Sequence, residues 1–270
     1  MKYFAYCIAL CMIASTAVFG QRQTKDVDTF TKISFRVPGK LYVRQGSPQK
    51  VEIEGDKDAL EKTIVKVEGS KLIITVESKW SNWSFGKDDE VNVYVTVKDI
   101  DALNVSGSGD LIGETKIVTR ELALNVSGSG NLKVEAEVSG EMEADVSGSG
   151  DLFVKGHCAS FNSDVSGSGK VNAAVAVTNR ADFGVSGSGK VEASGSASEV
   201  KVSISGSGKV LAANLETNTC NVRISGSGDV EISVKHEIDA NITGSGSVRY
   251  RGEPSKVSSH ASGSGSVRKM

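Results

Sequence analysis

Residues 122–132 read Leu-Ala-Leu-Asn-Val-Ser-Gly-Ser-Gly-Asn-Leu: an alternating apolar segment, a Ser-Gly-Ser-Gly corner, and another apolar residue two positions beyond the corner. The same arrangement recurs along the rest of the chain. Its corner tetrapeptides begin at Ser106, Ser127, Ser147, Ser166, Ser186, Ser205, Ser225, Thr243 (as Thr-Gly-Ser-Gly) and Ser262. Nine copies at a period near 20 residues predict a solenoid, in which each repeat forms one coil of a stack.

The residues on either side of each corner indicate which side chains fill the interior. The residue before each corner is Val105, Val126, Val146, Val165, Val185, Ile204, Ile224, Ile242 or Ala261. Two positions after the corners stand Leu111, Leu132, Leu152, Val171, Val191, Val210, Val230, Val248 and Val267. Period-two alternation of β-branched residues is typical of strands. Like residues stacked about 4.8 Å apart would form two continuous buried columns.

We therefore expect an all-β fold, a single-stranded parallel β-helix (β-solenoid) with coils of about 20 residues and Ser-Gly-Ser-Gly corners. A β-propeller is a poorer solution, because its blades need about 40–50 residues each. Strict alternation from Val105 predicts that both glycines of the first corner, Gly107 and Gly109, point inward, where no side chain fits.

The chain divides into a targeting segment and one folded region. Lys2 precedes an apolar run at residues 3–19, so residues 1–20 are interpreted as a signal peptide cleaved after Gly20. Residues 21–270 are interpreted as one β-helix, with irregular first coils and a cap in 21–100 and nine corner coils in 101–270. A short helix is expected at 56–63, capped by Asp56. No segment after the cleavage site is apolar for 18 residues, so no transmembrane segment is expected there.

Composition narrows the class of protein further. The formal net charge of −2 gives no general attraction to nucleic acid. After signal cleavage two cysteines remain, Cys158 and Cys220, at different positions of coils about three apart. We expect two free thiols, with Cys220 in the core. The few cysteine and histidine residues show no metal-ligand spacing, so neither a metal nor another cofactor is expected.

The repeat, V-S-G-S-G-[DNK]-[LV] after strand residues and downstream of a signal peptide, resembles the head GIN domain family of auto-transporter adhesins. The resemblance covers roughly residues 28–268 and includes the segments Phe30-Thr31-Lys32-Ile33 and Tyr42-Val43-Arg44-Gln45-Gly46. It implies a β-helical protein exported by Bacteroidetes-type bacteria, located in the cell envelope or secreted, with an adhesive role. It implies no catalytic residues.

Two groups of residues are candidate ligand contacts. Trp80 and Trp83 lie in a polar loop, where aromatic rings could stack on sugars or could instead cover the open end of the sheet. Lys170, Lys190 and Lys209 follow three consecutive corners and would form a row of ammonium groups. This row suits an anionic glycan, or it is a solvated edge balanced by Glu192 and Glu199.

Other chemistries fit the sequence less well. The residue after each corner is lysine in three coils, which does not suit a repeated calcium site. Asp145 and Asp151 flank one corner, but no nucleophile or acid–base cluster is evident. A hydroxyl ladder for ice binding would need threonine at the corners, and only one corner, at Thr243, has it.

We therefore expect an exported, non-enzymatic binding or structural module of the bacterial cell envelope. Its partner would be a glycan or an envelope protein, and it would be a monomer or an end-to-end dimer. The compartment would be the periplasm, the outer-membrane surface or the exterior. The alternatives are a periplasmic scaffold without an adhesive ligand and an envelope polysaccharide-processing enzyme built on a β-helix.

Overall fold

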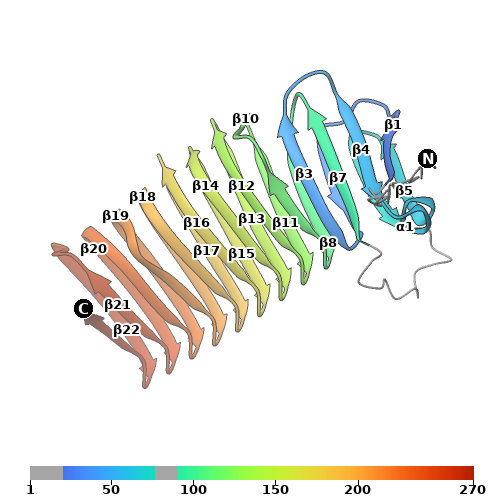
Figure 1. The fold of residues 1–270 in the computed structure, drawn as a ribbon. Coiled ribbons are helices and arrows are strands. Elements are labelled where there is room, and N and C mark those ends of the chain that lie inside the picture. Colours follow the sequence, from blue (N-terminus) through green and yellow to red (C-terminus); the bar gives the residue numbers. More distant parts are fainter. Residues whose placement is uncertain (1–20, 77–89) are drawn as a thin grey trace, which may run out of the picture.

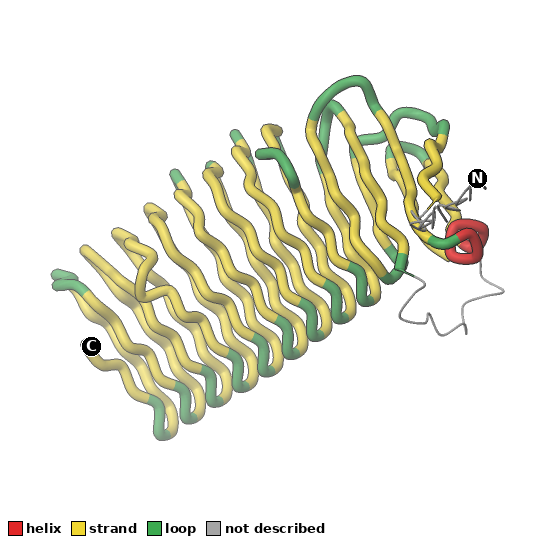
Figure 2. Tube along the Cα trace, in the orientation of Figure 1, coloured by secondary structure: helices red, strands yellow, loops and turns green. Residues whose placement is uncertain are grey.

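The computed structural model describes residues 21–76 and 90–270 (Figure 1). Within these residues, 23 strands join one hydrogen-bonded sheet and a single short helix accompanies them. The strands wind into a long solenoid, with the N-terminal coils at one end and β22 and β23 at the other. The glycine-containing corners form a line along one edge of the solenoid (Figure 2).

Each repeat contributes one strand before its corner and one strand after it. The early coils consist of β8 (Ala102–Gly107) and β9 (Asp110–Gly113), β11 (Leu122–Gly128) and β12 (Asn131–Val138), β13 (Glu141–Gly148) and β14 (Asp151–Cys158), β15 (Ser160–Gly167) and β16 (Lys170–Val177), and β17 (Arg180–Gly187). Three long strands then run from corner to corner: β18 (Lys190–Gly206), β19 (Lys209–Gly226) and β20 (Asp229–Gly244). The last strands are β21 (Ser247–Arg251), β22 (Lys256–Gly263) and β23 (Ser266–Lys269), and the short β10 (Ile117–Thr119) pairs with the end of β12.

The solenoid therefore has two faces. We call the strands that precede the corners the entry sheet; it contains β8, β11, β13, β15, β17, β22 and the C-terminal halves of β18, β19 and β20. We call the strands that follow the corners the exit sheet. All of these strands pair in parallel, and equivalent residues of successive repeats stand side by side: Val105 pairs with Val126, and Leu111 with Leu132. The expected parallel β-helix is confirmed.

The two predicted columns form the core over most of the solenoid. From Val105 to Ile242, and from Leu111 to Val248, every member is at least 97% buried. The last coil differs: Ala261 is exposed and Val267 is only half-buried. The prediction was wrong for these two residues, because no further coil of the described chain covers their inner face.

The two glycines of each corner have different surroundings. Gly109 is buried, and a Cβ there would overlap the Phe35 ring, so its inward position is confirmed. Gly107 is exposed and a Cβ there would meet nothing within 4 Å, so the expectation that it points inward was wrong. Position 107 favours glycine because the backbone there adopts a φ of +103°, which residues with a side chain rarely take.

The N-terminal coils do not stack in chain order. They contain β1 (Gln21–Lys25), β2 (Lys32–Phe35), β3 (Gly39–Gln45), β4 (Lys50–Gly55), β5 (Thr63–Glu68), β6 (Lys71–Val76) and β7 (Val91–Val97). β2 pairs with both β6 and β8, and β3 with both β7 and β9, so the first coil along the chain is the second in space. Beyond β6 and β7, at the N-terminal end of the solenoid, the pairing becomes antiparallel. The antiparallel pairs are β5 with β6, β4 with β7, and β1 with β4.

The predicted helix and thiols are present. Helix α1 (Lys57–Lys62) buries Ala59 and Leu60, and Asp56 occupies its N-cap position but makes no side-chain capping hydrogen bond. Cys158 and Cys220 are both buried and free, as expected. Because burial disfavours the thiolate, it raises the pKa of each thiol to about 12.

Candidate functional site

The lysine row lies on the exit sheet, where Lys170, Lys190 and Lys209 stand in register on β16, β18 and β19. Glu192 pairs with both Lys170, at 2.7 Å, and Lys190, at 3.5 Å. Lys209 pairs instead with Asp229, at 3.1 Å.

Each ammonium group of the row therefore has a carboxylate partner. The hydrogen bond from Lys170 is the main cause that lowers the pKa of Glu192. Glu199, which was expected to balance the row, lies on the entry sheet opposite Arg180. Trp80 and Trp83 lie outside the described residues, so their role as sugar contacts stays a prediction.

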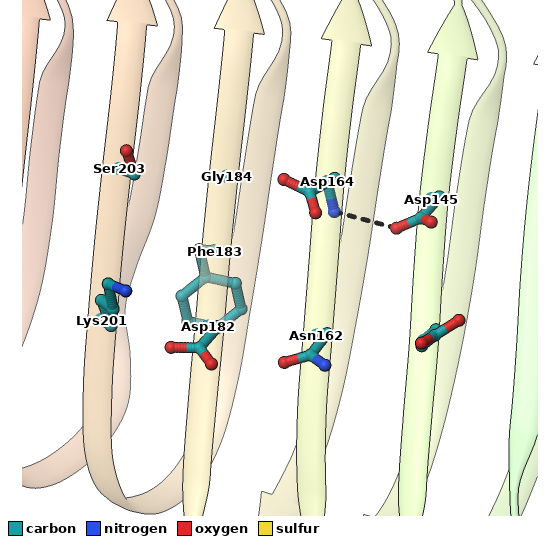
Figure 3. A pocket seen from close by; sticks show the side chains of 9 residues that line it. Asp145, Asn162, Asp164, Asp182, Phe183, Gly184, Lys201 and Ser203 are labelled. Atoms are coloured by element: carbon teal, nitrogen blue, oxygen red, sulfur yellow. Dashed lines mark hydrogen bonds between the residues drawn. The ribbon is translucent and has the colours of Figure 1, made fainter.

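A different feature hollows the outer surface of the entry sheet, where successive coils place polar residues side by side (Figure 3). We call it the Gly184 hollow; its volume is about 360 Å³. Its lining residues are Glu143, Asp145, Asn162, Asp164, Asp182, Phe183, Gly184, Lys201 and Ser203. These residues come from four neighbouring strands, β13, β15, β17 and β18.

Alternation along each strand explains why the polar lining residues face outward. On β17, Phe183 is buried and packs edge-to-face on Phe161, with ring centroids 6.1 Å apart. Its neighbours Asp182 and Gly184 therefore lie on the outer side. Gly184 has no side chain; it lies between Asp164 and Ser203 of the adjacent strands, and the Asp164 carboxylate reaches toward the space where a Cβ would stand.

Carboxylates crowd the hollow. The backbone N–H of Asp164 donates to Asp145 Oδ1 at 3.1 Å. Burial is the main cause that raises the pKa of Asp145, and the nearby charges of Asp164 and Glu143 raise it further against that hydrogen bond. On the next strand, Asp182 Oδ2 accepts a hydrogen bond from Arg180 Nε at 2.8 Å. The other oxygen, Asp182 Oδ1, is buried and has no hydrogen-bond partner among the described residues.

A second hollow, of about 440 Å³, adjoins the first on the same sheet. We call it the Ala123 hollow; it is lined by Lys32, Asp101, Ala102, Arg120, Glu121, Leu122, Ala123, Glu141 and Glu143. The two hollows share Glu143 as a lining residue, and we call the two together the groove. A single outward column runs along it in register: Lys32, Ala102, Ala123, Glu143, Asn162, Asp182 and Lys201.

The groove offers hydrogen-bond acceptors and negative charge on a rigid sheet, an arrangement that suits binding. The described residues contain no group of His, Cys, Asp or Glu side chains placed to hold a metal ion. The part of the chain that the structure describes also includes no helix with the length and apolar character of a membrane span.

The sequence interpretation missed this groove because it compared residues across a corner. Asp145 and Asp151 flank a corner in sequence. Asp145, however, lies on the outer surface of the entry sheet, and Asp151 begins a strand of the exit sheet. The structure instead brings Asp145 beside Asp164, one coil further along. Aligning the repeats on their corners, and following the outward positions from coil to coil, would have found the carboxylates of the groove.

The fold and the groove define a parallel β-solenoid with a polar groove on one of its two faces. The chain belongs to the family described as "Putative auto-transporter adhesin, head GIN domain", whose model matches residues 29–193 and 174–254.

Solved structures from Parabacteroides share the fold. A "putative lipid binding protein" from Parabacteroides distasonis ATCC 8503 is 22% identical, with a TM-score of 0.69 over 94% of this chain and 98% of the other. A "putative adhesin" from the same organism is 22% identical, with a TM-score of 0.67 over 93% and 98%. A "putative adhesin" from Parabacteroides merdae ATCC 43184 is 21% identical, with a TM-score of 0.66 over 93% and 95%. Among curated proteins, none matches this chain in sequence.

Proposed function

We propose that the protein is an exported, non-enzymatic binding module of the bacterial cell envelope and that its binding surface is the groove of the entry sheet. Membership of an adhesin family supports a binding role. The positively charged and then apolar start of residues 1–20 supports export through a cleaved signal peptide. The observation that carries the proposal is the groove itself: two contiguous hollows on neighbouring coils, lined mainly by polar groups.

The rigidity of the surface supports binding rather than a purely structural role. Parallel strands held in register fix the outward side chains at a regular spacing, and the buried columns beneath them leave little freedom for the backbone to move. A preorganised surface loses little conformational entropy when a ligand binds.

The proposal is tested with residues 21–270 and two variants. Gly184→Gln adds a side chain to the lining of the Gly184 hollow, and Ala174→Gln places the same side chain at an exposed position of the exit sheet. Binding to a glycan array and to a peptide array is measured for each. We expect a ligand that the unaltered chain and Ala174→Gln retain and that Gly184→Gln loses.

Three results would overturn the proposal. Unchanged binding by Gly184→Gln would remove the groove as the binding surface. Absence of any ligand on both arrays would favour a scaffold without an adhesive partner. Turnover of an envelope polysaccharide, abolished by Gly184→Gln, would identify an enzyme.

A further inference from the structure

The groove is negatively charged, and this charge favours some classes of ligand over others. Its middle section, on β13, β15 and β17, carries five carboxylates: Glu141, Glu143, Asp145, Asp164 and Asp182. Among the described residues, Asp182 alone of these five forms an ion pair, with Arg180. The three lysines of the row on the exit sheet, by contrast, are all paired with carboxylates of the same sheet. The groove therefore retains negative charge available to a ligand.

The length of the groove indicates the shape of its ligand. From Lys32 on β2 to Lys201 on β18, its outward column crosses seven neighbouring strands. Six spacings of about 4.8 Å give about 29 Å, the length of about nine residues of extended peptide. The lysines stand at the two ends of this column and the carboxylates in its middle. A complementary ligand is thus elongated, with positive charge at its centre and neutral or acidic ends.

We propose that the ligand is an extended segment of an envelope protein that carries arginine or lysine side chains. This inference rests on the proposed function. The segment would cross the strands and run along the solenoid axis. The Gly184 hollow receives one of these side chains between Asp164 and Asp182. A guanidinium group presents two parallel N–H donors to carboxylate oxygens.

Ligands of other charge fit the same surface less well. A neutral glycan would cover several carboxylates without a compensating charge, and desolvating unpaired charges is costly. An anionic glycan would be repelled by the same groups. A cationic peptide segment neutralises the carboxylates as it covers them.

The test uses a fluorescein-labelled peptide, EARARARAE, and the same peptide with glutamine in place of arginine. Binding is measured by fluorescence polarisation to three forms of residues 21–270. The groove variant carries Glu143→Gln, Asp164→Asn and Asp182→Asn. The control variant carries Glu135→Gln, Glu137→Gln and Asp151→Asn, an equal charge change on the exit sheet. Circular dichroism verifies that both variants are folded.

We expect the arginine peptide to bind the unaltered chain and the control variant alike and the groove variant at least tenfold more weakly. Added salt should weaken this binding, and the glutamine peptide should not bind. Equal binding to both variants would indicate general charge attraction and overturn the inference. A glycan that binds in the groove while the arginine peptide does not would also overturn it, yet leave the proposed function standing. Failure of every glycan and peptide to bind would overturn both.

Discussion

Asp164 and Gly184 are neighbours on adjacent coils, and a Cβ atom placed on Gly184 would overlap Asp164 Oδ1. The shape of the hollow at this point therefore depends on both residues, since the Asp164 carboxylate occupies part of the space that a side chain on Gly184 would need. Gly184 does not adopt a positive φ, so this overlap is the main steric obstacle to a larger residue.

A double-mutant cycle tests this relationship. Gly184→Ala should lower the free energy of unfolding by less than about 1 kcal/mol and so lower the melting temperature slightly. The loss is small because the overlapping atom, Asp164 Oδ1, is at the end of a side chain that can move. In an Asp164→Ala background the same change should stabilise by about 0.5 kcal/mol, because alanine is better than glycine within a strand. Thermal unfolding of the four forms provides the measurement. An identical effect of Gly184→Ala in both backgrounds would show that the two residues are not coupled.

The fold followed from the sequence because its determinants are local and repeated. The apolar residues around each corner, such as Val126 and Leu132, specify both the strands and their stacking register. The order of the N-terminal coils did not follow, because residues 21–100 lack the corner motif and alternation alone does not determine which strands pair. The placement of β2 between β6 and β8 depends on long-range packing.

The groove was harder to predict for a related reason. Most of its charged and polar residues are ordinary outward side chains when a single repeat is considered. Its hollow appears only when Asp164, Gly184 and Ser203 are placed side by side on three coils. The unpartnered Asp182 Oδ1 likewise depends on side-chain geometry that spacing does not specify.

The corner glycines offer a second, matched test. Gly107 and Gly148 both have positive φ, but a Cβ on Gly107 meets nothing, whereas a Cβ on Gly148 would lie 2.6 Å from Gly128 O. Gly107→Ala should cost about 1–2 kcal/mol of backbone strain. Gly148→Ala should cost about 1–3 kcal/mol more, because two stacked corners must also separate. Chemical denaturation of the two variants measures the difference, and equal losses would mean that stacking does not constrain the corners.

The buried columns should dominate stability. Leu132 is fully buried between equivalent leucines, so Leu132→Ala should cost about 2–5 kcal/mol. Val118 is 58% exposed, and Val118→Ala should change stability by less than about 0.5 kcal/mol. Denaturant midpoints compare the two variants. A small loss for Leu132→Ala would contradict the assignment of this column as the main source of stability.

The two thiols should be inert in the folded protein. Cys158 and Cys220 are buried, and burial raises each pKa to about 12, so almost no thiolate forms at pH 8. A colorimetric thiol reagent should give little reaction with the native chain and two equivalents after denaturation of residues 21–270. Fast labelling of either cysteine in the native state would mean that its coil opens readily.

The crowded carboxylates of the groove should make stability depend on pH in a particular direction. Burial, aided by the charges of Asp164 and Glu143, raises the pKa of Asp145 in the folded state. The folded protein therefore holds this proton more tightly than the unfolded chain, so the stability it contributes is present at low pH and is lost as pH rises through the folded pKa. Asp145→Asn should raise the melting temperature at pH 7, and the gain should shrink as the pH falls toward 3.

Asp229 provides a control of opposite sign. The hydrogen bond from Ser247, followed by the hydrogen bond and charge of Lys209, lowers the pKa of Asp229. Its contribution to stability is present above the unfolded pKa and is lost as pH falls through the folded pKa. Asp229→Asn should therefore lower the melting temperature at pH 7, with a loss that shrinks on acidification. Melting curves of both variants between pH 3 and 7 separate the two cases. A loss of stability in Asp145→Asn at pH 7 would mean that its hydrogen bond with Asp164 outweighs the cost of crowding negative charge into the groove.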